Sequence, residues 1–419
     1  MQQIYDVVVC GGGLAGVCAA LAAAENGAKT LLIERNAFPG GNATAALVSP
    51  FMGFTHEPEI SRDEYGFKVY GWQKYLNSGI FPRIIDRLRG EGGMSKLSTP
   101  FSADPEILKY VLESMLVEAG VELLYAAQVC GVEKTAAGSL FTIEAVECLC
   151  KEGLRQFAGR RFIDATGDAD LTSCAGGSFL MGDENGTTQA ATLMFLIDNV
   201  DEAQVTTYRQ AHPEEFEDSD YGTVSGFTSQ IATAAGRGEL PEHIRRFVLF
   251  RLPEQGRYAA NITHYYEINA TVSESVTKAA IELRAQMMQV FRVMRRDLPG
   301  FANAYISASG SYPGIRESRR IAGVTYFTVD MLRECPVPEK YLALCSYPVD
   351  LHMKNAPANN MHTMGLFGIP EGTCIHREFT NLYAAGRNLS TDRLVHSAIR
   401  VMGVVASIGE SVGRLCLRK

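Results

Sequence analysis

Residues 5–34, YDVVVCGGGLAGVCAALAAAENGAKTLLIE, decide the fold of this chain. The run 5–10 is short, apolar and β-branched, which is typical of a strand buried on both faces of a parallel sheet. A GxGxxG pattern follows it, and then come an alanine-rich helix over 17–26, a second strand over 29–33 and the acidic residue Glu34. Strand, glycine turn, helix, strand and acid in this order predict the dinucleotide-binding unit of a Rossmann-like sheet.

The glycines and the acid of this unit each have a physical task. Gly11 permits the tight turn, Gly13 lets the backbone approach a pyrophosphate, and Gly16 lets the helix pack against the strand. The free N–H groups at the helix start favour the charge of a diphosphate, and Glu34 can accept hydrogen bonds from both ribose hydroxyls. The alternative is a glycine-rich turn in some other α/β protein. The contacts predicted from this unit are Gly11, Gly13, Leu14, Ala15, Gly16, Glu34 and Arg35.

NAD and FAD share this first unit, so later segments decide between them. The loop 35–44, RNAFPGGNAT, has two glycines that let it run close beneath an extended cofactor, although a plain surface loop is the alternative. The segments 161–170 and 381–388 are apolar strands that run into glycine, where an open α/β sheet binds its ligand. A helix predicted over 397–417 would point its N-terminal dipole at the pyrimidine end of a flavin. The further cofactor contacts predicted are Gly40, Gly41, Asn42, Thr44, Val129, Ala165, Thr166, Gly167, Gly386, Arg387, Arg400 and Val401.

Three of these segments resemble motifs of a known family. ERNAFPGGNAT, FIDATGDADL and NLYAAGRNLS are similar to flavin-contacting motifs of bacterial FAD-dependent oxidoreductases related to the fumarate reductase and succinate dehydrogenase flavoproteins. They occur in the family's order and span nearly the whole chain. Segments 311–323 and 346–352 resemble a branch known only as FAD-dependent oxidoreductases. The resemblance implies an FAD fold like that of glutathione reductase, but it indicates almost nothing about the substrate.

Two departures from that family limit what it implies. Members with covalent flavin carry a histidine just after the Gly-Gly loop, and this chain has Asn42, Ala43 and Thr44 there. We therefore expect non-covalent FAD. The dicarboxylate-binding motifs of fumarate reductases are not evident, since His212 lies in an acidic stretch that reads as a loop. Succinate or fumarate chemistry is not expected.

Composition excludes several classes of protein. The chain has 419 residues, 46% apolar and 21% charged, which is ordinary globular composition with room for two domains. Its net charge of −8 counts against nucleic-acid and anionic-membrane partners. Ten cysteines without a CxxC pair predict reduced thiols, and eight histidines without HxH or HExxH spacing predict no metal site. Asp6 and the glycines after it argue against an export signal, so we expect a cytoplasmic protein without a membrane span.

The predicted fold class is α/β. A Rossmann-like FAD-binding domain, with a parallel sheet and a β-meander over 121–149, is expected from 1–175 and 376–419. An inserted α+β substrate domain is expected over 176–375. A long helix that starts at Ser273 carries apolar and methionine positions at helical spacing, which predict core packing.

Arginines around Gly314 are the first candidates for chemistry. A flavin exchanges a hydride, so the protein must orient the substrate and manage a proton. The candidates are Tyr312, Arg316, Arg319 and Arg320. An arginine among them can clamp a carboxylate in two parallel bonds. A structural lattice with Glu317 is the alternative, and a helix here would place Arg316 and Arg320 on one face.

Tyr347, Asp350 and His352 are the second set of candidates. His352 titrates near neutral pH and can move a proton, while Asp350 can orient it. A structural histidine is the alternative, and His396 near the expected flavin is a rival. The predicted catalytic residues are His352, Arg316, Tyr347 and Arg319.

These features together predict an FAD-dependent oxidoreductase that exchanges a hydride between non-covalent FAD and a small, carboxylate-bearing metabolite. Two alternatives stay open: a flavoprotein without net redox change, of the isomerase or RNA-modifying type, and a flavin-binding module that reports redox state. The negative charge and the lack of a basic, aromatic patch speak against RNA. The chain has no second GxGxxG followed by an acid, so the sequence predicts no built-in NAD(P)H domain. The electron acceptor or donor is therefore unknown.

Overall fold

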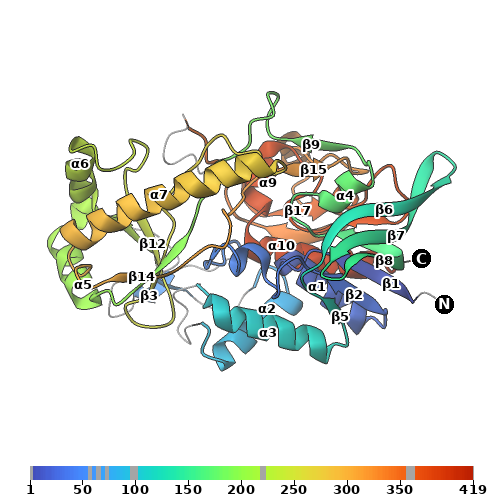
Figure 1. Cartoon of the computed structure of the whole chain (residues 1–419), viewed down its shortest axis with the longest axis horizontal. Coiled ribbons are helices and arrows are strands. Elements are labelled where there is room, and N and C mark those ends of the chain that lie inside the picture. The colour runs from blue at the N-terminus through green and yellow to red at the C-terminus, as the bar shows by residue number, and fades with distance from the viewer. Residues whose placement is uncertain are drawn as a thin grey trace.

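The computed structural model describes residues 3–54, 75–94, 102–217, 223–354 and 364–418, and the backbone alone of 59–62 and 68–70. It has a mixed α/β fold with a Rossmann-like parallel sheet, as predicted. In Figure 1 this sheet lies at the right with both chain ends beside it, and an antiparallel sheet lies at the left. The long helix α7 (Ser273–Asp297) runs from one towards the other.

The first sheet has the strand order β5-β2-β1-β8-β7-β6, and β18 also pairs with β8. Its strands are β1 (Ile4–Cys10), β2 (Thr30–Ile33), β5 (Glu122–Leu124), β6 (Gln128–Ala137), β7 (Leu140–Cys150), β8 (Gly153–Asp164) and β18 (Leu382–Ala384). β5, β2, β1, β8 and β18 pair in parallel, whereas β6, β7 and β8 form the predicted antiparallel meander. β8 serves both parts, because its first half pairs with β7 and its end pairs with β18.

The carboxyl ends of four parallel strands meet at one edge of this sheet. The N–H of Gly11, after β1, donates to the last carbonyl of β2 at 2.8 Å. The N–H of Ala165, after β8, donates to the end of β1 at 2.8 Å, and that of Ala385, after β18, donates to the end of β8 at 2.9 Å. The first glycine turn and the two later strand endings therefore lie side by side.

Four helices pack on this sheet or on one another: α1 (Leu14–Glu25), α2 (Ile80–Gly90), α3 (Pro105–Glu118) and α10 (Met402–Leu415). Glycines let α1 and α10 approach closely. A Cβ on Gly409 would lie 2.0 Å from the carbonyl oxygen of Ala15, and a Cβ on Gly413 would lie 2.3 Å from that of Ala19. Residue numbers rise together along this contact, so the helices run in the same direction and both begin at the ligand-binding edge.

The C-terminal helix differs from its prediction. Instead of one helix over 397–417 there are two, α9 (Arg393–Ile399) and α10, interrupted at Arg400 and Val401. Val401 is extended, with φ −69° and ψ 145°. The guanidinium of Arg400 donates to the backbone and carboxylate oxygens of Asp350, at 3.0 and 2.9 Å. These tertiary bonds override a local pattern that contains no proline or glycine at the break.

The second sheet has the order β11-β12-β13-β10-β14 and is antiparallel. Its strands are β10 (Phe195–Asp198), β11 (Thr223–Gly226), β12 (Phe247–Arg251), β13 (Tyr258–Ala260) and β14 (Tyr305–Ser309), accompanied by α5 (Glu202–Ala211), α6 (Thr228–Gly236) and α7. One apolar cluster joins these strands and helices. Met287 and Met294 of α7 are buried in it, which confirms the prediction that the methionine stripe is core packing.

The remaining elements are short. They are β3 (Glu59–Arg62), β4 (Lys68–Tyr70), α4 (Asp170–Cys174), β9 (Phe179–Met181), β15 (Arg319–Ile321), α8 (Val329–Glu334), β16 (Tyr341–Cys345) and β17 (Phe367–Pro370), with single 3₁₀ turns at Gly41–Ala43, Pro213–Glu215 and Glu371–Thr373. Ile321, Phe327 and Phe367 belong to the same apolar cluster as α1 and α10. We therefore propose that the inserted domain spans about 188–318, a shorter range than the predicted 176–375. No helix in the described part of the chain is long and apolar enough to cross a membrane.

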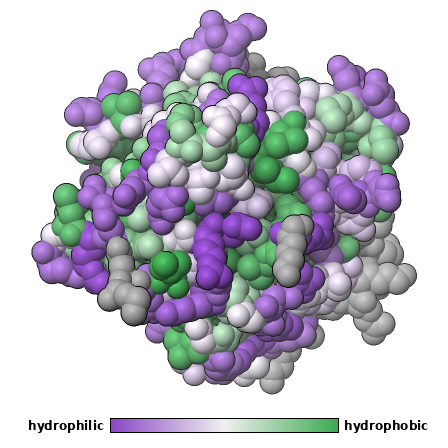
Figure 2. All heavy atoms as spheres, turned by 90° about the vertical axis from the view of Figure 1, so that its right-hand side faces the viewer, coloured by the Kyte–Doolittle hydropathy of each residue, from purple (hydrophilic) through white to green (hydrophobic). Residues whose placement is uncertain are grey.

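The end of the molecule that carries the first sheet and the chain ends is mixed in polarity. Figure 2 shows hydrophilic side chains over most of this face and hydrophobic ones in scattered groups. Scattered apolar side chains of this kind are usual on a protein surface.

Candidate functional site

Three adjoining cavities follow the edge where the parallel strands end. We call them the outer pocket, the middle groove and the inner cavity, with volumes of about 40, 120 and 200 Å³. Gly11, Glu34, Arg35 and Thr166 line both the outer pocket and the middle groove. The residues shared by the middle groove and the inner cavity are Asn42, Ile315, Arg387, Arg400 and Met402. The three spaces therefore form one elongated site across the sheet edge.

The predicted cofactor residues gather along this site. Those that line it are Gly11, Gly13, Leu14, Ala15, Glu34, Arg35, Gly40, Gly41, Asn42, Val129, Ala165, Thr166, Gly167, Gly386, Arg387, Arg400 and Val401. Gly16 and Thr44 stand behind it. A Cβ on Gly16 would lie 1.9 Å from the carbonyl oxygen of Gly11, so only glycine fits beneath the turn. The hydroxyl of Thr44 donates to the carbonyl of Pro39 at 2.8 Å and holds the Gly-Gly loop.

Bare backbone forms the wall of the middle groove, as a diphosphate requires. The N–H of Gly40 donates to the carbonyl of Gly12 at 2.7 Å, which places the loop over the first turn. A Cβ on Gly41 would lie 2.9 Å from the Cα of Gly13. The first turn of α1 carries no acidic side chain, so its N–H groups and dipole can act on an anion.

Glu34 is held at the junction of the outer pocket and the middle groove. Its buried carboxylate accepts the N–H of Gly12 at 2.7 Å and both the backbone and side-chain N–H groups of Asn36 at 2.8 and 2.7 Å. This fixed acid beside the glycine turn suits the hydroxyls of a ribose. The bare backbone of the groove thus suits the diphosphate of an adenine dinucleotide, and Glu34, at the junction with the outer pocket, suits its ribose.

The predicted cofactor contacts did not include Asp168 and Tyr312 of the middle groove or Asp170 of the outer pocket, although Tyr312 was among the candidates for chemistry around Gly314. Burial alone would raise the pKa of Asp168, but hydrogen bonds and charge from Arg387 and Ser318 hold it below its usual value. Burial and the neighbouring carboxylate of Asp168 raise the pKa of Asp170 to about 6. Both aspartates stand in the motif FIDATGDADL, so the signal that could have found them was present.

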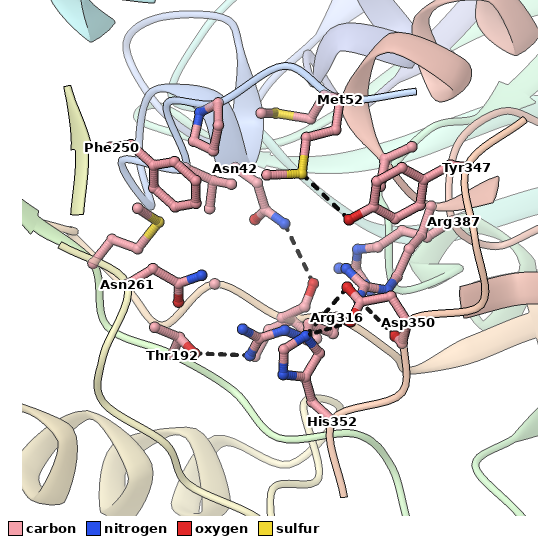
Figure 3. A pocket seen from close by; sticks show the side chains of 18 residues that line it. Asn42, Met52, Thr192, Phe250, Asn261, Arg316, Tyr347, Asp350, His352 and Arg387 are labelled. Carbon is pink, nitrogen blue, oxygen red and sulfur yellow. Dashed lines mark hydrogen bonds and ion pairs between the residues drawn. The ribbon is translucent and has the colours of Figure 1, made fainter. Parts of the chain in front are cut away.

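The inner cavity has an apolar side and a charged side. Val48, Met52, Met194 and Phe250 line the first. The charged and polar groups are Arg316, Tyr347, Asp350, His352, Arg387 and Arg400. Figure 3 shows Phe250 and Met52 across the cavity from Arg316 and His352. A ligand that spans this space meets carbon on one side and cations on the other.

Arg316 differs from the other two arginines of the cavity. Arg387 pairs with Asp168 at 2.8 Å, and Arg400 pairs with Asp350 at 2.9 Å. The guanidinium of Arg316 donates to the carbonyl of Ala190 and to the hydroxyl of Thr192, both at 2.7 Å, and meets no carboxylate among the described residues. Burial and the charge of Arg400 lower its pKa to about 10. This cation is therefore incompletely neutralised by the protein's own groups.

His352 and Asp350 form a hydrogen-bonded pair beside this arginine. The Nε2 of His352 lies 3.0 Å from Asp350 Oδ1. Burial and the charge of Arg316 lower the pKa of His352 to about 4, against the opposing effect of Asp350. Burial would raise the pKa of Asp350, but the His352 hydrogen bond and the charges of His352, Arg400 and Arg316 lower it. The ring is therefore neutral at pH 7, and because a carboxylate accepts from Nε2–H, the lone pair lies on Nδ1.

Not every candidate reaches the inner cavity. The hydroxyl of Tyr347 does, 3.3 Å from Met52 Sδ. Arg319 instead pairs with Asp170 at 2.8 Å, outside the residues that line this cavity. His396 is buried, and its Nε2 bonds the carbonyl of Arg387 at 2.9 Å.

The conditional prediction of a helix at the arginine segment is wrong, because residues 319–321 form strand β15. Arg320 pairs with the fully buried Glu317 at 2.7 Å, which also accepts from Arg393. The arginines of the segment thus divide into one that lines the inner cavity, Arg316, and two that form structural ion pairs, Arg319 and Arg320.

Family comparison identifies the cofactor of this site. The model of the FAD dependent oxidoreductase family matches residues 6–418, almost the whole chain. The chain belongs to this family. It is thus an oxidoreductase with FAD as its cofactor, and the outer pocket and middle groove have the residues to hold the nucleotide part of that cofactor.

Two curated relatives of this FAD dependent oxidoreductase match over short segments. Thioredoxin reductase of Ureaplasma parvum is 32% identical over 88 residues, which are 21% of this chain and 27% of that protein. Digeranylgeranylglycerophospholipid reductase of Methanocaldococcus jannaschii is 42% identical over 66 residues, 15% of this chain and 17% of that protein. The chain spans less than a third of either relative, and neither identifies a substrate.

Solved structures with similar folds include L-amino acid deaminase from Proteus myxofaciens in complex with anthranilate, with TM-score 0.48, 13% identity and coverage of 99% of this chain and 90% of that one. A geranylgeranyl bacteriochlorophyll reductase-like protein from Thermoplasma acidophilum has TM-score 0.47, 13% identity and coverage of 99% and 78%. These similarities are too low to carry an argument about the reaction.

Proposed function

We propose that this FAD dependent oxidoreductase exchanges a hydride between non-covalent FAD and a small metabolite that carries a carboxylate. The observation that carries this proposal is Arg316, the inner-cavity arginine without a carboxylate partner in the described part of the chain. A half-buried cation without a counter-charge is costly unless a ligand supplies one. A guanidinium binds a carboxylate through short, charge-assisted hydrogen bonds of fixed geometry.

The residues of the Gly-Gly loop support non-covalent attachment. Asn42 lines the groove next to Gly41, and Ala43 and Thr44 follow it. In the flavoprotein family that this chain resembles, members with covalently bound flavin carry a histidine at this place, and none of these three side chains is a histidine.

Each group of the inner cavity has a role in this proposal. FAD, when bound, supplies a hydride acceptor or donor. Arg316 fixes the carboxylate and so orients the carbon that reacts. His352 takes a proton at Nδ1 from the substrate hydroxyl or amine, or returns it in the reverse direction, while Asp350 holds the Nε2–H tautomer. The apolar side, with Phe250 and Met52, excludes water from the reacting atoms.

Anaerobic mixing of the FAD-loaded protein with 2-hydroxy and 2-amino carboxylates tests this function. The expected result is bleaching of the flavin absorbance by a member of this set and not by its carboxamide analogue. Arg316→Gln should keep the FAD content and raise the concentration for half-maximal reduction by about 10- to 150-fold, the value of a charged hydrogen bond.

Arg333 provides a matched control, because its side chain is 73% exposed and pairs with the exposed Asp330. Arg333→Gln should leave the flavin reduction unchanged. Equal reduction by carboxylates and carboxamides, or an unchanged Arg316→Gln protein, would refute the carboxylate site.

A further inference from the structure

The charges around His352 are unbalanced. Two guanidinium groups, those of Arg316 and Arg400, line the cavity beside it, and Asp350 is the one carboxylate that lines this space in the described residues. Asp350 already accepts from Arg400 at 2.9 Å and lies 3.0 Å from Nε2 of His352. Figure 3 shows Arg316, Asp350 and His352 converging at one side of the cavity.

Among the described residues, the rings stacked on and around His352 supply no negative charge. His264, which follows β13, stacks on it with ring centroids 6.1 Å apart. His264 in turn contacts Tyr266 at 5.8 Å and His243 at 5.7 Å. The Nδ1 of His264 bonds the carbonyl of Ile262 at 2.9 Å. A proton on either imidazole would place a third cation in a cluster with a single carboxylate.

We propose that binding of a carboxylate beside Arg316 is coupled to the uptake of one proton by His352. This inference rests on the proposed function, since it takes Arg316 as the partner of the carboxylate. The proton comes from solvent and adds to Nδ1, which converts the imidazole to imidazolium without breaking any other bond. His352 receives it in preference to His264, because only His352 contacts Asp350.

The coupling follows from charge alone. An anion within about 4–6 Å raises the pKa of a cationic acid by about 1–3 units. The pKa of His352, lowered to about 4 by burial and Arg316, then rises towards neutral pH. A base works best when its pKa is near the operating pH. Below this raised pKa the complex holds the added proton on Nδ1, and above it Nδ1 is free to act as a base whose pKa is close to the operating pH.

Linkage gives a measurable consequence. If the anion raises the pKa, then proton uptake must tighten anion binding by the same factor. A rise of about two to three units makes the Kd about 4- to 30-fold lower at about pH 5.5 than at about pH 8. A neutral ligand of the same shape should bind with the same Kd at both values.

Acetate and acetamide are the matched probes for this test. The FAD-loaded protein is titrated with each at constant ionic strength between about pH 5.5 and pH 8, where acetate is ionised. Perturbation of the flavin absorbance reports the Kd. Calorimetry of acetate binding to the wild-type protein in two buffers of different ionisation heat counts the protons taken up, so this arm needs no substitution.

Two variants identify the group that takes the proton. His352→Asn is expected to bind acetate with a Kd independent of pH, and His264→Asn is expected to keep the pH dependence. The FAD content of each variant shows whether it has folded. If His352→Asn loses FAD, His352→Gln and the calorimetric count on the wild-type protein decide.

The outcomes separate the two proposals. A Kd for acetate that is independent of pH in the wild-type protein, or a pH dependence that survives in His352→Asn, overturns the coupling and leaves the carboxylate site standing. Failure of acetate to perturb the flavin at any pH overturns both the coupling and the carboxylate site.

Discussion

Gly409→Ala is expected to weaken FAD binding and to lower the stability of the protein, although Gly409 lines none of the three cavities. A Cβ here would lie 2.0 Å from the carbonyl oxygen of Ala15 and 2.7 Å from its carbon. Both atoms are backbone, so α1 and α10 must separate by about 1 Å, and overpacking of this kind costs about 1–3 kcal/mol. Ala15 also lines the middle groove. Displacement of the α1 start would forfeit a dipole interaction of about 0.3–2 kcal/mol, which weakens FAD binding by about 2- to 30-fold.

Gly90→Ala is the matched control, because no described atom outside its chain neighbours and its own helix backbone lies within 4 Å of the place of its Cβ. It ends helix α2 and should be neutral or stabilise by up to about 1 kcal/mol. Urea unfolding followed by circular dichroism gives the midpoint of each variant, and the fluorescence of released flavin gives the Kd for FAD. A Gly409→Ala protein with the wild-type urea midpoint and the wild-type Kd for FAD would overturn this explanation, because it would show that the glycine contact does not set the distance between α1 and α10.

Three further predictions follow from the buried charges. Asp350→Asn should slow substrate-driven flavin reduction at least about tenfold at unchanged FAD content, because His352 loses the charged acceptor of its Nε2–H; an unchanged stopped-flow rate would contradict this. The free energy of unfolding should fall as pH falls from about 6.5 to 4, because the unfolded chain protonates His352 in a range where the folded protein keeps it neutral. Urea midpoints across that range should show a shallower slope for His352→Asn. Glu317→Gln should lower the free energy of unfolding by about 3–5 kcal/mol, because this buried carboxylate neutralises Arg320 and Arg393; a loss below about 1 kcal/mol would argue against the network.

Much of the nucleotide-binding fold could be predicted because local rules govern it. The strand run 5–10, the glycine turn and Glu34 each have one stable role in a parallel sheet, and their register follows from β1 pairing with β2. The break between α9 and α10 could not be predicted. Residues 397–405 read as continuous helix, and the partner that interrupts them, Asp350, is some fifty positions away in sequence.

The inner cavity shows where sequence spacing stops being informative. Arg316, Arg319 and Arg320 look equivalent in a segment of unknown conformation, and only the extended backbone of the segment separates the cavity arginine from the two that form ion pairs. His264 carried no signal at all, since a single histidine before a tyrosine has no motif. It reaches the site through a stack on His352, a contact between segments that are 88 positions apart.

The charged side of the cavity is assembled across the junction of the two sheets. Arg316 donates hydrogen bonds to Ala190 and Thr192, beside the second sheet. Asp350 instead accepts from Arg400, at the break between α9 and α10. A substrate carboxylate at Arg316 and a proton acceptor at His352 therefore keep their spacing only while both sets of hydrogen bonds hold. A shift of the second sheet by about 1 Å would change that spacing directly, and misplacement of this size can cost about 100-fold in rate. Substitutions at Thr192, although its hydroxyl does no chemistry, should then affect the rate of flavin reduction more than the binding of FAD.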